Sequence, residues 1–135
     1  MPPKVLVVFA PQRQSRLLEI LEGQALQIEC AAGFLDAREK LGGPARYALL
    51  LVDAELDDGS WQDLMQFARR SGTAAAGVIC ARLGDHRLWA EVLDSGAYDL
   101  ITEPYEQQEV ARILEGALNC RSLERPARAL MDSSS

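Results

Sequence analysis

The chain has 135 residues, a length that suits one compact domain. A hydrophobic share of 48% and a charged share of 25% are ordinary for a globular protein and exclude wholesale disorder or a collagen-like chain. Because the formal net charge is −6, we expect no nucleic-acid binding by this domain. Apolar runs such as residues 49–52 are too short to span a membrane, and there is no signal-peptide pattern, so we expect a cytoplasmic protein without membrane contact.

The three cysteines and the single histidine do not have metal-ligand spacing. Cys30, Cys80 and Cys120 are far apart and form no CxxC pair, and His86 stands alone. We therefore expect reduced thiols, a surface histidine and no metal site built from these residues.

Five short apolar runs predict strands, and three of them are continuously apolar, as in strands that are buried on both faces of a parallel sheet. In chain order the predicted strands are residues 4–9, 26–31, 47–52, 77–81 and 99–102.

The segments between and after these runs have helical periodicity. The apolar positions in chain order are Leu17, Leu18 and Leu21; Phe34, Ala37 and Leu41; Trp61, Leu64, Met65 and Ala68; Leu88, Trp89, Val92 and Leu93; and Val110, Ile113, Leu114, Ala117 and Leu118. Ser60 is the expected N-cap of the third helix, with Asp63 three positions on. Glycines at positions 42, 72 and 96 mark expected helix ends.

Five alternating strand and helix units predict a doubly wound α/β domain with a five-stranded parallel sheet between two layers of helices. We expect this domain to occupy residues 1–120. Residues 121–135 lose the periodicity and are predicted to be a C-terminal tail, either a frayed end or the stump of a linker.

Ligands of such sheets bind at the carboxyl ends of the strands. Two acidic residues lie there: Asp53 follows the most apolar predicted strand, and Glu103 follows the last one. A carboxylate at the end of a buried strand is costly unless it reaches solvent or a partner, so Asp53 is a candidate site residue.

Five motifs in order resemble the receiver domain of two-component response regulators, over residues 4–119. They are Lys-Val-Leu-Val-Val at 4–8, Leu-Leu-Val-Asp at 50–53, Leu-Asp-Asp-Gly-Ser at 56–60, Leu-Asp-Ser-Gly-Ala-Tyr-Asp-Leu at 93–100 and Glu-Pro-Tyr at 103–105. The resemblance implies a flavodoxin-like fold with strand order 2-1-3-4-5. It also makes Asp53 the phosphoacceptor position, and it implies a cis peptide bond between Glu103 and Pro104.

The resemblance also indicates an altered active site. Where the family has an acidic pair for Mg²⁺, this chain has Phe9 and Ala10. Ala81 stands at the position of the hydroxyl residue, and Glu103 at that of the lysine. Leu100 stands at the position of the aromatic switch residue. Ala10 offers no side-chain oxygen to a cation, and Glu103 would repel a phosphoryl group. We therefore expect Mg²⁺ binding to be weak or lost, with no other cofactor.

Two hypotheses describe what replaces the lost groups. Arg82 follows the fourth predicted strand, and its guanidinium could bridge Asp53 and Glu103 as a fixed cation in place of metal and lysine. Phe9 could fill the space of the former metal site and exclude water.

The leading hypothesis is a degenerate receiver (a pseudo-receiver). It would be a two-component, or phosphorelay, signalling module that acts by protein–protein interaction with a histidine kinase, another signalling protein or an output domain. The alternative is a response regulator that still takes a phosphoryl group on Asp53, at most catalysing its own phosphorylation and dephosphorylation. A third possibility, a flavodoxin-like enzyme or nucleotide binder, is disfavoured because residues 10–15 contain no glycine and include a proline.

A homodimer through the fourth helix, fifth strand and fifth helix is a further expectation from the resemblance. Trp89 and Tyr105 border that surface, where they would form an interface if exposed and pack in the core if not.

Overall fold

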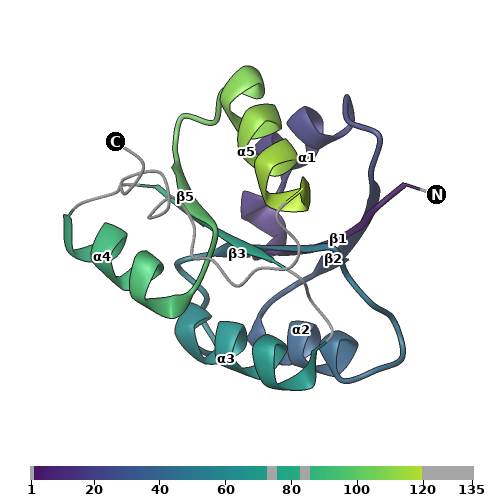
Figure 1. Ribbon diagram of the computed structural model, residues 1–135, viewed down its shortest axis with the longest axis vertical. Helices are drawn as coiled ribbons and strands as arrows, with labels where there is room; N and C mark the ends of the chain where they lie inside the picture. The colour runs from purple at the N-terminus through teal and green to yellow at the C-terminus, as the bar shows by residue number, and fades with distance from the viewer. Residues whose placement is uncertain (1, 73–75, 83–85, 120–135) are drawn as a thin grey trace.

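The computed structural model describes residues 2–72, 76–82 and 86–119 and shows one parallel sheet between two layers of helices (Figure 1). The sheet has five strands in the order β2-β1-β3-β4-β5, which confirms the predicted topology. The strands are β1 (Lys4–Val8), β2 (Gln27–Ala31), β3 (Leu49–Asp53), β4 (Gly77–Ala81) and β5 (Asp99–Thr102).

Helices α1 and α5 cover one face of the sheet, and α2, α3 and α4 cover the other (Figure 1). The helices are α1 (Ser15–Leu21), α2 (Phe34–Leu41), α3 (Trp61–Ser71), α4 (His86–Ser95) and α5 (Gln107–Asn119), and a short 3₁₀ helix, η1 (Pro11–Arg13), follows β1. Because every crossover from one strand to the next passes through a helix, all neighbouring strands run parallel.

The core consists of one hydrophobic cluster on each face of the sheet. On the α1 and α5 face, alternate residues of β1 and β3 pack against Leu17, Ile113 and Leu114. On the other face, the remaining strand residues pack against Trp61 and Leu64 of α3. Both faces of the central strands are therefore buried, which explains their unbroken apolar sequence.

Local sequence signals set the ends of α3 as expected. The backbone N–H of Asp63 donates to Ser60 Oγ at 3.0 Å, which confirms the predicted N-cap. Gly72 ends the helix with a φ of 69°, a left-handed conformation that glycine adopts without steric cost.

Three strands differ from the prediction by one or two residues at an end. β1 ends at Val8 instead of residue 9, and β2 begins at Gln27. β3 covers Leu49–Asp53 instead of residues 47–52, because Asp53 stays in register with Cys80 of β4. Asp53 is thus part of the strand, and its carboxylate lies at the carboxyl end of β3.

Some predictions concern residues beyond those described. Residues 121–135 and Cys120 lie outside the described residues, so the predicted tail stays a prediction.

Cys30 is exposed, Cys80 is buried, and both are free thiols. His86 lies on the surface as expected. In the described part of the chain, none of the helices has the length and apolarity to cross a bilayer.

Candidate functional site

The site is centred on Asp53, the last residue of the central strand β3. Its side chain has no exposed surface, and the strand is paired with β1 on one side and with β4 on the other. A carboxylate at this depth loses its hydration, so it must be compensated by hydrogen bonds or by a cation.

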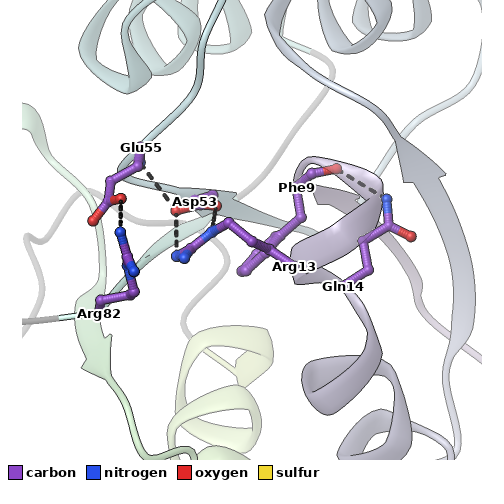
Figure 2. Close-up of polar contacts among 6 residues, drawn as sticks. All are labelled: Phe9, Arg13, Gln14, Asp53, Glu55 and Arg82. Atoms are coloured by element: carbon purple, nitrogen blue, oxygen red, sulfur yellow. Dashed lines mark hydrogen bonds and ion pairs between the residues drawn. The ribbon is translucent and has the colours of Figure 1, made fainter.

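Arg13 supplies that compensation (Figure 2). Its Nε donates to Asp53 Oδ2 at 2.5 Å and its Nη2 donates to Asp53 Oδ1 at 3.1 Å. The guanidinium is therefore hydrogen-bonded to both carboxylate oxygens. The side chain of Arg13 is only 18% exposed. The hydrogen bond to Asp53 is the main cause that raises the pKa of Arg13, and burial acts against it. The result is a planar, charge-assisted pair, the strongest geometry for arginine and carboxylate.

The loop after β1 brings Arg13 to the sheet edge. The backbone N–H of Arg13 donates to the Ala10 carbonyl at 2.9 Å and closes the 3₁₀ turn that begins at Pro11. Gln14 Nε2 donates to the Phe9 carbonyl at 2.9 Å and ties the end of this turn to the strand (Figure 2). Proline fits the first position of the turn because it has no N–H to satisfy there.

The loop after β3 adds a third hydrogen bond to Asp53. The backbone N–H of Glu55 donates to Asp53 Oδ1 at 3.0 Å. The two carboxylate oxygens therefore accept three hydrogen bonds, two from Arg13 and one from this loop. Asp53 is tied to two separate loops at the carboxyl edge of the sheet.

The hypothesis that Arg82 bridges Asp53 and Glu103 is wrong. Arg82 Nη2 instead donates to Glu55 Oε1 at 3.2 Å, and this pair is exposed, with side-chain exposures of 58% and 48% (Figure 2). The cation beside Asp53 is Arg13, which comes from the loop after β1, on the side of β3 opposite to β4.

The other sequence-predicted positions lie around the same edge. Phe9 is fully buried and packs in the cluster of the α1 and α5 face, Ala81 is buried, Ala10 and Leu100 are half-buried, and Glu103 is exposed. The Glu103–Pro104 peptide bond is cis, as predicted. Since Glu103 faces solvent, its charge is screened by water and the guanidinium, not this carboxylate, is in contact with Asp53.

The two aromatic residues of the expected interface pack in the protein. Tyr105 is only 3% exposed, and burial is the main cause that raises its pKa. Its hydroxyl has no hydrogen-bond partner among the described residues. Trp89 is half-buried against the second hydrophobic cluster. At these two positions the core-packing interpretation describes the structure.

Arg13 is the site residue that sequence reasoning missed. The available signal was its place in the loop after β1, four residues beyond Phe9, where the family that the sequence resembles has its acidic residues. A cation in this loop can reach a carboxylate that ends the neighbouring strand, because β1 and β3 are adjacent in the sheet.

Comparison with family models gives no match. Among curated proteins, the response regulator protein PilR of Pseudomonas aeruginosa is 29% identical over 122 residues, which is 90% of this chain and 27% of that protein. The chain thus spans about a quarter of the length of this relative.

Solved structures of similar fold include receiver domains. The signal receiver domain of a protein described as a Luxo repressor from Vibrio parahaemolyticus has a TM-score of 0.80, with 19% identity over 92% of this chain and 95% of that one. A CheY-like receiver domain from Methanospirillum hungatei has a TM-score of 0.77, with 20% identity over 93% of this chain and all of that one. The fold is therefore the flavodoxin-like receiver fold. Over 90% of its length the chain is also similar in sequence to a response regulator.

Proposed function

We propose that this chain is a receiver-type signalling module of a two-component system that acts by protein–protein interaction, with Mg²⁺-dependent phosphorylation impaired or lost. The observation that carries the proposal is the bidentate ion pair between Arg13 and the buried Asp53. Both oxygens of the acceptor carboxylate are already engaged, so an incoming phosphoryl group has to displace Arg13 before it can be attacked.

The residues around Asp53 also do not fit a magnesium ion. Mg²⁺ requires oxygen ligands in near-octahedral geometry. Phe9 and Ala10 carry no side-chain oxygen, and the carboxylate that remains is occupied by a guanidinium. A cation would have to compete with Arg13 for Asp53 across a distance at which like charges repel strongly.

Phosphoryl transfer would lack further help in this site. Such transfer depends mainly on positioning and on neutralising the charge of the phosphoryl oxygens. Ala81 cannot donate a hydrogen bond from its side chain, and Glu103 adds a negative charge where the family has a lysine. These substitutions support a module that signals through contacts and does not act as an enzyme.

The partners that we propose follow from the family. They are a histidine kinase or another signalling protein, or an output domain, and the acidic body of the chain makes a cytoplasmic protein partner better suited than nucleic acid. Dimer formation through α4, β5 and α5 remains part of this proposal.

One observation favours a second function. Asp53 is kept at the acceptor position, and Arg13 is a cation that could balance a phosphoryl group once its bond to the carboxylate opens. In this alternative a partner supplies the missing groups and Asp53 still forms an acyl phosphate. The carboxylate oxygen attacks phosphorus, the bond from phosphorus to the donor's oxygen or imidazole nitrogen breaks, and the donor leaves with that electron pair.

Intact-mass measurement distinguishes the two functions. The full chain is incubated with acetyl phosphate and Mg²⁺, beside Asp53→Asn and a phosphorylatable receiver that shows the donor is active. We expect no increase of about 80 Da, the mass of a phosphoryl group. An increase in the wild type that is absent from Asp53→Asn would overturn the proposal and establish the alternative.

A further inference from the structure

A groove of about 320 Å³ lies beside the ion pair, at the carboxyl edge of the sheet. Its lining comes from the loops after β1, β2 and β3 and comprises Ala10, Ala32, Gly33, Leu35, Leu56 and the acidic residues Asp36, Asp57 and Asp58. The groove therefore joins three loops that are far apart in the sequence. Its lining combines small and apolar residues with three aspartates.

Leu35 is the most unusual residue of this groove. Its side chain is 62% exposed, and among the described residues it is the large hydrophobic side chain that faces solvent. It lies in the first turn of α2, where its backbone N–H is already bonded. A leucine at the margin of a groove, next to carboxylates, offers apolar contact area that the protein's own core does not use.

Asp58 holds two of the loops in a fixed arrangement. Its Oδ1 accepts from the Phe34 N–H at 2.7 Å, and its Oδ2 accepts from the Leu35 N–H at 3.1 Å. These backbone hydrogen bonds are the main cause that lowers the pKa of Asp58. A residue of the loop after β3 thus caps α2, whose own N-cap, Gly33, has no side chain for this purpose.

The Arg13–Asp53 pair fixes the third loop against the others. Ala10 of the groove directly precedes the 3₁₀ turn that carries Arg13. On the other side, Asp53 accepts a hydrogen bond from Glu55, the residue before Leu56 of the groove. The ion pair therefore links two of the three loops that form the groove, those after β1 and β3, and fixes them relative to each other.

We infer that this groove docks a partner protein through a segment that has an apolar side chain flanked by arginine or lysine. The inference rests on the proposed function, because it names the partner chemistry of that interaction module. Leu35 and Leu56 of the lining provide the apolar contact, and the lining residues Asp36 and Asp57 provide the complementary charge. Since the groove is preformed, docking requires little ordering of the receiver.

The experiment titrates the isotope-labelled full chain with a short synthetic peptide that alternates leucine and arginine, and follows the backbone amides by NMR. We expect the largest shifts at residues 32–36 and 56–58. Peptides in which glutamate replaces arginine, or serine replaces leucine, should not produce them. Leu35→Ser and Asp57→Lys should each lower the affinity for the peptide by about tenfold.

A matched variant separates specific docking from general attraction to an acidic protein. Asp94→Lys changes the net charge as much as Asp57→Lys does, but Asp94 lines a different hollow, between α3 and α4. Asp94→Lys should leave the affinity unchanged. Equal weakening by both variants, or shifts that map outside the groove, would overturn the inference.

Two further outcomes remain distinct. If the same shifts appear when the concentration of the chain is raised without peptide, the groove binds a second copy and the assignment to a separate partner is wrong. If Asp53 gains a phosphoryl group while the groove variants behave as expected, the proposed loss of phosphorylation fails but the docking groove stands.

Discussion

Two arginine–carboxylate pairs lie at the same edge of the sheet and differ mainly in depth. Arg13 binds the fully buried Asp53 with two nitrogens, whereas Arg82 binds the exposed Glu55 with one (Figure 2). Each pair joins an arginine to a carboxylate, so the chemical groups are the same in the two places. What separates them is the amount of water around each carboxylate.

That difference in hydration decides what each pair contributes. The exposed pair exchanges protein contacts for water contacts at almost no change in free energy. The buried pair has no such exchange, because the Asp53 side chain without Arg13 would remain desolvated and without a cation. A buried pair of this kind is therefore weak evidence for extra stability, but removing only one of its two residues is costly.

The largest predicted effect is that of Arg13→Met. This substitution leaves Asp53 buried without its cation, so we expect the free energy of unfolding to fall by about 3 kcal/mol. Urea unfolding followed by circular dichroism measures it. The double variant Arg13→Met, Asp53→Leu removes both charges and should recover most of the loss. If the single variant is as stable as the wild type, the ion pair does not compensate a buried charge.

An intermediate effect is predicted for Asp58→Ala, which removes the cap of α2. We expect a loss of about 1 kcal/mol at neutral pH, as for other helix caps. Because the pKa of Asp58 is lowered in the folded protein, its contribution is full above the ordinary carboxyl pKa and disappears as the pH falls through the lowered value. The stability difference between the two proteins should therefore narrow on acidification.

Urea unfolding at neutral pH and near pH 3 tests this prediction, with Asp57→Ala as the matched variant in the same loop. Asp57 is exposed and is not the cap, so its removal should change the unfolding free energy less than that of Asp58. A difference for Asp58→Ala that stays constant with pH would show that the carboxylate charge has no part in capping.

The smallest effect is predicted for Arg82→Met. The pair with Glu55 is exposed, so the change in unfolding free energy should stay below about 0.5 kcal/mol and shrink further as salt is added. Thermal unfolding at low and high salt measures both. A loss comparable to that of Arg13→Met would erase the contrast between the two pairs.

Elements built from local signals could be predicted from the sequence, and the site could be predicted only in part. The apolar runs, the helix periodicity and the Ser60 cap depend on residues within a few positions of one another, and all are present in the structure. The position of Asp53 followed from the end of its strand. Its partner did not, since Arg13 lies 40 positions away in the chain.

The error over Arg82 has the same origin. Arg82 follows β4 and Arg13 follows β1, and both strands neighbour β3. From the sequence alone, either arginine is therefore placed to reach Asp53. The choice between the two depends on the 3₁₀ turn at Pro11–Arg13, which directs the side chain inward. Such a turn has no periodicity, and the sequence pattern therefore carries little information about it.

A counterion that is a side chain of the protein cannot be removed by dialysis or by a chelator. Receivers that depend on a dissolved cation change occupancy with its concentration, whereas Arg13 is present at Asp53 in every folded molecule. The position of the cation beside Asp53 is therefore set when the chain folds. Under the proposed function we expect the cell to adjust this module through the number of copies it makes and keeps.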